Sequence, residues 1–245
     1  MRTSEKTMYG RKIVGKSPFV IIAPHAAGDD LGTGIIAYRL AKKLDAFLVQ
    51  NNIFKKPSSS RAAKQLEKVE DFNMLSWSYT KKKYLWGRKH KAMKEFFKDI
   101  DVFCTEARSM REDSKCVAIH IHGMTSTTIG IDIGVGAKMG MYTNMIYGAR
   151  TYNLFHKNNG KITIKISLVK KLRKALEKIV KKVYNLEVTI GQHYSGWSKT
   201  SAIQFHKHEG RVDYAIQLEL NQKLRQKKNI DKTVRYIHNA LLKIN

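Results

Sequence analysis

Apolar residues occur along the chain either in short continuous runs or at helical spacing. Residues 19–23, 116–121 and 214–220 are apolar at most positions, a pattern typical of strands buried on both faces of a sheet. Residues 33–48 and 168–183 repeat apolar side chains every three or four positions, with polar residues between them. This spacing predicts two amphipathic helices.

Shorter signals complete the predicted order of elements. They predict further strands at 47–51, 102–105 and 188–190, helices at 61–69, 89–99 and 233–244, and a short strand or helix lead-in at 161–164. Because strands alternate with helices, we expect an α/β fold with a mostly parallel or mixed central sheet covered by helices on both faces, of the phosphorylase- or hydrolase-like kind. No repeat or long linker is visible, so residues 1–245 are predicted to form a single domain.

The charge of the chain is far from balanced. Lys and Arg number 46 against 20 Asp and Glu, which gives a formal net charge of +26. Such a field attracts acidic substrates and nucleic acids, but the basic residues are spread along the chain and the excess is equally explained by composition. Aromatic and basic residues are interleaved at 77–86, a combination found in nucleic-acid-binding proteins. A nucleic-acid-binding protein, or a hydrolase acting on an acylated polyanion, is therefore the alternative function.

Composition also bears on location. No apolar run approaches the roughly 18 residues that a membrane span needs, and residues 1–12 contain no apolar signal-peptide core. Cys104 and Cys116 do not form a CxxC motif, and two reduced cysteines are the expected state of such a pair. We therefore expect a cytoplasmic protein.

Ionisable side chains follow or end three of the predicted strands. His25 and the Asp29–Asp30 pair come after the first, His120 and His122 end another, and Glu219 lies near the end of the last. Sites in open α/β sheets form beyond the carboxyl ends of the strands. Two imidazoles and one carboxylate make a three-ligand catalytic zinc set, and a further carboxylate can take a proton from water and pass it to a leaving amine. The residue types fit metal-assisted hydrolysis.

Each of these residues also has a structural interpretation. Asp29 or Asp30 is a good N-cap for the helix that follows. His120 and His122 alternate along one strand, so they could form a solvated histidine face. Glu219 stands within an apolar run, where a carboxylate is rarely buried without a partner.

Several motifs resemble the N-formylglutamate amidohydrolase family, within the wider group of zinc-dependent exopeptidase-like folds. The similar segments span residues 17–44, 117–136 and 194–225, in the family's order. Their motifs are PHAAGDD at 24–30, HIHGM at 120–124, GIDIG at 130–134 and YAIQLELNQKLR at 214–225.

The resemblance implies an enzyme of the N-formylglutamate deformylase type (EC 3.5.1-type). Such an enzyme cleaves an amide bond of a small acidic or peptide-like substrate, glutamyl or aspartyl in type, with metal-activated water. Carried over by position, His25, an aspartate at 29 or 30, and His122 would hold one Zn2+ per chain, or another divalent metal. Glu219 would be the general base.

Substrate contacts are less clearly marked in the motifs. The family's arginine-bearing strand motif has no clear counterpart, and Arg108 and Arg111 are the nearest candidates for binding a substrate carboxylate. His120, which stands where the family usually has aspartate, His193 and Arg225 are the other residues predicted to contact the substrate. The sequence leaves the oligomeric state open.

Overall fold

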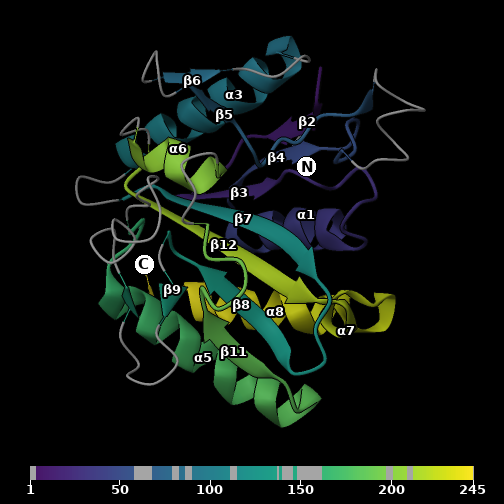
Figure 1. The fold of residues 1–245 in the computed structure, drawn as a ribbon, viewed down its shortest axis with the longest axis vertical. Coiled ribbons are helices and arrows are strands. Elements are labelled where there is room, and N and C mark those ends of the chain that lie inside the picture. Colours follow the sequence, from purple (N-terminus) through teal and green to yellow (C-terminus); the bar gives the residue numbers. More distant parts are fainter. Residues whose placement is uncertain are drawn as a thin grey trace.

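A central sheet organises the chain, and within the described residues it contains eight strands (Figure 1). This computed structural model describes residues 4–57, 68–78, 83–85, 90–110, 115–136, 138–139, 146–147, 162–196, 201–208 and 212–244. The elements are, in chain order, β1 (Glu5–Thr7), β2 (Gly10–Ile13), β3 (Phe19–Ala23), α1 (Thr33–Leu44), β4 (Phe47–Asn51), β5 (Ser76–Ser78), β6 (Lys83–Leu85), α3 (His90–Ser109), β7 (Val117–Met124), β8 (Ile129–Gly134), β9 (Lys138–Met139), β10 (Ile146–Tyr147), α5 (Ile166–Tyr184), β11 (Glu187–Ile190), α6 (Ala202–His208), β12 (Tyr214–Asn221), α7 (Gln222–Arg225), a 3-10 turn η2 (Lys227–Asn229) and α8 (Ile230–Leu241).

The sheet is mixed. Its strand order is β1-β2-β4-β3-β7-β12-β8-β11. Strands β4, β3, β7 and β12 are mutually parallel neighbours, whereas β8 runs antiparallel to β12 and parallel to β11. The last strand of the chain, β12, therefore lies between β7 and β8, and the predicted α/β fold with a mixed sheet is confirmed.

Helices cover both faces of this sheet, as Figure 1 shows. Helices α1, α5 and α8 share the core on one face, where α8 packs against both α1 and α5, and α3 and α6 pack on the other face. Successive residues of a strand point to opposite faces, so β7 sends Ile119 and Ile121 into the core under α1 and sends His120 and His122 toward the α3 side. Both histidines are buried, so the predicted alternative of a solvated histidine face is wrong.

The strand predicted at 102–105 is wrong, because these residues lie inside α3. The run VFCT contains three residues of types that favour strands, but it continues a stripe of apolar side chains at helical spacing. The buried members of this stripe are Phe96, Phe97, Ile100, Phe103, Cys104 and Ala107. Helical periodicity maintained over the twenty residues of α3 outweighs the preference of residues 102–105 for a strand. The helix predicted at 89–99 is correspondingly longer.

Other predictions have mixed outcomes. Of the helix predicted at 61–69, residues 61–67 lie outside the described residues, and Val69 instead forms an isolated parallel bridge with Lys55. The interleaved stretch 77–86 includes β5 and β6, which pair as a two-stranded antiparallel sheet, but its side chains lie outside the described residues. Nucleic-acid binding therefore stays a prediction.

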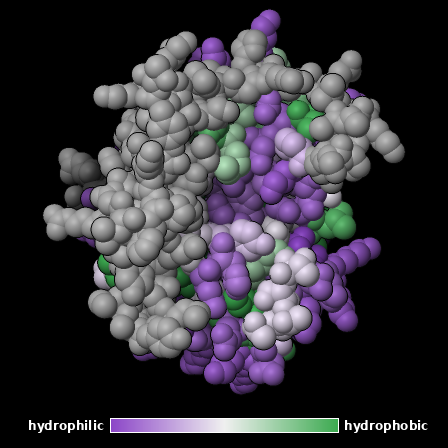
Figure 2. Space-filling model, viewed as in Figure 1, coloured by the Kyte–Doolittle hydropathy of each residue, from purple (hydrophilic) through white to green (hydrophobic). Residues whose placement is uncertain are grey.

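The surface is rich in hydrophilic residues. Helix α5 buries Val169, Leu172, Leu176 and Val180 against the sheet and turns its lysines to solvent. Figure 2 shows hydrophilic side chains gathered over the centre of one face of the molecule. Among the described residues, no helix combines the length and the apolar character needed to cross a membrane.

Candidate metal centre and active site

The loop between β3 and α1 carries the first two residues of the site. His25 follows β3 by two positions, and the backbone carbonyl of Asp30 accepts bonds from the Thr33 N–H (3.1 Å) and hydroxyl (2.6 Å). Helix α1 has Gly32 as its N-cap and no side-chain capping bond. Neither aspartate caps the helix, so the N-cap interpretation of Asp29 and Asp30 is wrong. The Asp30 side chain is left to point toward His25.

Neighbouring strands supply the other two residues. His122 belongs to β7 and Glu219 to β12, and the two are register partners in the parallel ladder. Because both strands place these positions on the α3 side of the sheet, the two side chains share one face. The insertion of β12 beside β7 therefore brings the carboxylate of Glu219 next to the imidazole of His122.

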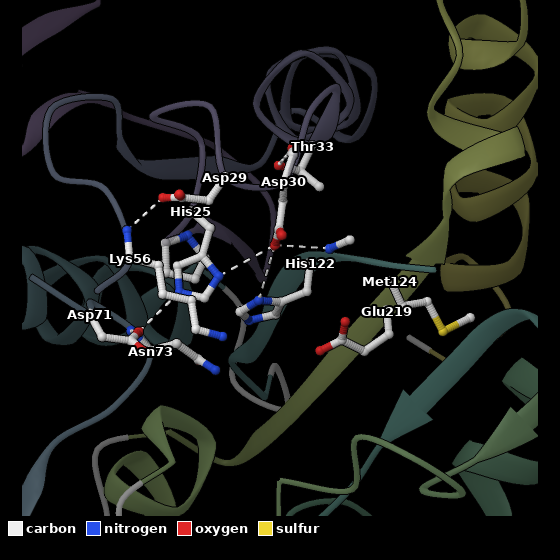
Figure 3. Close-up of polar contacts among 12 residues, drawn as sticks. His25, Asp29, Asp30, Thr33, Lys56, Asp71, Asn73, His122, Met124 and Glu219 are labelled. Atoms are coloured by element: carbon white, nitrogen blue, oxygen red, sulfur yellow. Dashed lines mark hydrogen bonds and ion pairs between the residues drawn. The ribbon is translucent and has the colours of Figure 1, made fainter. Parts of the chain in front are cut away.

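Three predicted ligands converge at this edge. The Nδ1 atoms of His25 and His122 lie 3.3 and 3.7 Å from Oδ2 of Asp30. One donor atom of each residue lies within 4.8 Å of the others. Figure 3 shows the three side chains pointing toward one another, with Glu219 directed toward the same space. The geometry selects Asp30, since Asp29 turns away and accepts the backbone N–H of Lys56 at 2.6 Å.

The electrostatics of this cluster favour a bound cation. Burial alone would lower the pKa of His25, but hydrogen bonds to Asp30 and Asp71 outweigh burial and raise it to about 9. Burial would raise the pKa of Asp30, yet the hydrogen bonds from His122 and His25 hold it well below its usual range. Burial lowers the pKa of the His122 imidazole. The ionised carboxylates of Asp30 and Asp71 thus flank a protonated His25. A metal cation can replace the proton of this imidazole.

The donor set fits zinc. Two imidazole nitrogens and one carboxylate form a set used by catalytic zinc sites, which leave a fourth position open. The second ring nitrogen of His25, Nε2, lies 2.9 Å from Oδ1 of Asp71. Metal-bound histidines commonly donate their other N–H to a carboxylate, which fixes the tautomer and the ring orientation. Asp71 could not be predicted from the sequence, because no motif surrounds it and its role depends on a contact across 46 residues.

Replacing Asp71 with asparagine is expected to weaken zinc binding about 10- to 100-fold, because His25 loses the carboxylate that orients its ring. Competition with a chromogenic chelator measures this affinity. Asp231→Asn is the matched control, since Asp231 is an exposed carboxylate that pairs with Arg39 on the surface. Equal affinities in the wild-type and Asp71→Asn proteins would exclude the orienting role.

Glu219 lines the same cavity as the three candidate ligands. This cavity has a volume of about 310 Å³ and is lined by His25, Asp30, Lys56, Asp71, Asn73, Met74, His122, Gly123, His193, Tyr194, Ser195, Gly196, Ser201, Gln217 and Glu219. The amide of Gln217 donates to Oε1 of Glu219 at 2.6 Å. Burial, reinforced by the charge of Asp30, raises the pKa of Glu219 to about 8. A buried carboxylate that titrates near neutral pH is suited to general acid–base work.

The predicted substrate-binding residues are only partly brought together. His193 lines the cavity, but Arg108 donates to Asp213 at 2.8 Å and lines a different cavity. Asp213 immediately precedes β12, and it also accepts the N–H of Cys116 just before β7. Arg108 is therefore at the amino-terminal edge of the sheet, opposite the candidate metal ligands. Arg111 lies outside the described residues.

His120 is buried and Arg225 is half-buried, and neither residue lines the cavity. The His120 ring lies 6.3 Å from that of His122 and 5.3 Å from that of His206, between centroids. Burial, followed by the neighbouring His206, lowers the pKa of His120 well below its usual range. His120 is thus a neutral side chain packed behind His122.

A buried carboxylate organises one wall of the cavity. Asp132 on β8 accepts the N–H groups of Gln192, His193 and Tyr194 at 3.1, 2.8 and 2.9 Å. It also accepts the Thr189 hydroxyl at 2.8 Å. The GIDIG stretch therefore has a clear structural role, which is to hold residues 191–196 against the site.

Comparison with known proteins finds similar solved structures but no similar sequence. No protein-family model and no curated protein matches the sequence. Among solved structures, a bacteriophage poly-gamma-glutamate hydrolase is 10% identical, with 99% of this chain and 87% of that chain covered and a TM-score of 0.44. A gene product of Agrobacterium tumefaciens is 14% identical, with 94% and 92% covered and a TM-score of 0.49.

The N-formylglutamate amidohydrolase of Ralstonia eutropha JMP134 is 12% identical to this chain, with 99% of this chain and 95% of that chain covered and a TM-score of 0.50. At this identity the likeness concerns the backbone fold. The chain therefore has the same kind of α/β fold as N-formylglutamate amidohydrolase, as the resemblance in its motifs implies.

Proposed function

We propose that this protein is a zinc-dependent amidohydrolase that cleaves an amide bond of a small acidic substrate. The observation that carries the proposal is the convergence of His25, Asp30 and His122 at one edge of the cavity that also contains Glu219. The name of the Ralstonia eutropha protein, which has the same kind of fold, describes a reaction of this class.

The mechanism assigns the proton transfers to Glu219. Zinc, when bound, supplies a Lewis acid for the scissile carbonyl and lowers the pKa of water. Glu219 accepts a proton from the attacking water and then delivers it to the nitrogen of the leaving amine, so that the C–N bond breaks and no amide anion is released. Gln217 holds Oε1 of Glu219 in place, and Asp71 does the same for the ring of His25.

Other residues that line the cavity offer groups for substrate recognition. Lys56 is the one lysine or arginine among the described residues that line the cavity, and it takes the place predicted for Arg108. The hydroxyls of Ser195 and Ser201 are buried and have no hydrogen-bond partner within the described chain. Buried hydroxyls of this kind normally find a partner, and carboxylate or carbonyl oxygens of a substrate would supply one. This combination favours an acidic substrate that also carries neutral polar groups.

Replacing Lys56 with methionine is expected to raise KM for an N-acyl glutamate about 10-fold or more, with little change in kcat. A charge-assisted hydrogen bond contributes about 1.5–3 kcal/mol, and its loss in both ground state and transition state appears in KM alone. Lys55→Met is the matched control, since Lys55 is exposed and does not line the cavity. An unchanged KM for the acidic substrate, or an equal rise for N-acyl glutamine, would contradict the assignment.

Metal analysis combined with hydrolysis assays tests the proposed function. The purified protein is expected to hold about one zinc ion per chain, as a three-ligand catalytic site does. It is also expected to hydrolyse N-acyl glutamates or aspartates in preference to neutral N-acyl amino acids. Chelation should abolish the activity and zinc should restore it. The proposal fails if added zinc does not bind, or if His25→Ala retains the full amidase activity of the wild-type protein.

A further inference from the structure

Arg225 connects three separate parts of the candidate site. Its side chain donates to the carbonyl of Leu220 at 2.9 Å, to the carbonyl of Met124 at 3.3 Å and to the carbonyl of Leu31. These carbonyls belong to β12, to β7 and to the loop between β3 and α1. The same three elements carry Glu219, His122 and the pair His25 and Asp30.

Two glycines mark the space that this arginine occupies. A Cβ atom added at Gly123 would lie 2.5 Å from Cζ of Arg225, inside van der Waals contact. A Cβ atom added at Gly32 would lie 2.6 Å from the backbone oxygen of Arg225, and the positive φ of 86° at Gly32 also favours glycine. Arg225 thus packs directly against the backbone next to Asp30 and His122.

The contact at Gly123 leads directly to a candidate ligand. Gly123 follows His122 in β7, and its backbone N–H donates to Oδ2 of Asp30 at 3.0 Å. This is the oxygen that faces both histidines. A shift of Gly123 would therefore move two things at once. It would move the N–H group that orients the Asp30 carboxylate, and it would move the main chain beside His122.

We propose that Arg225 is a positioning residue that holds Asp30 and His122 in the arrangement needed to bind the metal, and that it does not bind the substrate. The inference rests on the proposed function. Arginine suits this task because its planar guanidinium presents several donors in fixed directions, whereas the ammonium of lysine is a point charge on a flexible chain. The requirement for a planar group with several donors explains why arginine occupies a half-buried position among carbonyl groups.

Metal binding by Arg225 variants tests the proposal, with cobalt(II) and zinc(II) as the probes. Arg225→Ala and Arg225→Lys are both expected to lower the affinity at least about 10-fold, as the loss of a residue that orients metal ligands does. Both should also alter the visible absorption of the cobalt form, which reports ligand geometry and is insensitive to a general loss of stability. Arg235→Ala, in an exposed arginine of α8, is the control and should change neither. Wild-type affinity and spectrum in folded Arg225→Ala would overturn the proposal.

A double-mutant cycle with Gly123 makes the test specific. Gly123→Ala alone should lower the affinity about 10-fold or more, because the new methyl group displaces the guanidinium. In the Arg225→Ala background the same change should have less than a twofold effect, because the space is empty. Additive effects of the two substitutions would contradict direct packing as the cause.

Hydrogen exchange separates this inference from the proposed function. If the wild-type protein binds neither metal, the proposed function is wrong, but the positioning role is still measurable in the metal-free chain. The Gly123 amide proton, which is bonded to Asp30, should then exchange at least about 10-fold faster in Arg225→Ala than in wild type or Arg235→Ala. Equal exchange rates in all three proteins would overturn the positioning role by itself.

Discussion

Replacing Glu219 with glutamine is expected to lower kcat by about 10²- to 10⁴-fold while making the metal-free protein more stable at alkaline pH. The loss of activity follows from the loss of the group that transfers the proton. Glutamine keeps the size of the side chain and can still accept the hydrogen bond from Gln217. The substitution therefore removes the charge with little change in packing.

The gain in stability follows from the pKa of the carboxyl group. Burial raises the pKa of Glu219 from 4.5 to about 8, so between these values the folded state keeps a proton that the unfolded state has released. The free energy of unfolding of the wild-type protein therefore falls as the pH rises through this window. Above about pH 8 the Glu219→Gln variant should be more stable by on the order of a few kcal/mol, whereas near pH 4 the two proteins should be equal.

Urea denaturation of chelator-treated protein at pH 4, 6 and 9 measures this difference. Gln217→Glu is not a suitable control, because it adds a further carboxylate beside Glu219 in the cavity. Asp231→Asn is suitable, since it removes an exposed carboxylate elsewhere. A Glu219→Gln variant that is less stable than wild type at pH 9, or that retains wild-type kcat, would contradict the role assigned to this residue.

Replacing Asp30 with asparagine is expected to lower zinc affinity more than 100-fold, whereas Asp29→Asn should change it less than threefold. The two residues are neighbours in sequence and identical in chemistry, so the pair is its own matched control. Asp30 faces both histidines, whereas Asp29 accepts a backbone N–H from Lys56. The removal of a metal ligand should exceed the 10- to 100-fold effect of removing a residue that only orients one.

The same pair makes a second prediction for the metal-free protein. The pKa of Asp30 is held well below its usual range by His122 and His25, against the effect of burial. Its ionised form thus stabilises the fold above the unfolded-state pKa, and this contribution is lost as the pH falls. Asp30→Asn should lower the free energy of unfolding at pH 6, and the difference from wild type should shrink toward pH 3.

For the zinc measurement, equal affinities in Asp30→Asn and Asp29→Asn, or a larger loss in Asp29→Asn, would show that Asp30 is not the ligand.

Much of the site could be predicted because strand ends are local features. The continuous apolar runs at 19–23 and 214–220 form strands buried on both faces, as β3 and β12 do. These runs are apolar at nearly every position because both faces of the strand are buried, which leaves little choice of side chain. The imidazoles and carboxylates at the ends of such runs are exceptions to this rule and so can be recognised without any tertiary information.

Arg108 could not be placed in the same way. If residues 102–105 had formed a strand, Arg108 would have followed its carboxyl end and faced the site. Because they belong to α3, the helix ends beside the start of β7, and the arginine pairs with Asp213 at the opposite edge. Because this one element was wrongly predicted, Arg108 was expected at the edge of the sheet opposite the one where it lies.

The sequence by itself determined the α/β class, most of the buried strands, and the ionisable groups at their ends, which are His25, the Asp29–Asp30 pair, His122 and Glu219. Only the tertiary structure decided which of these groups meet. The placement of β12 between β7 and β8 sets Glu219 beside His122, and the packing of residues 68–78 brings Asp71 to His25. Local preferences act over a few residues, whereas strand order and contacts across the chain depend on how the complete set of apolar faces can be buried together.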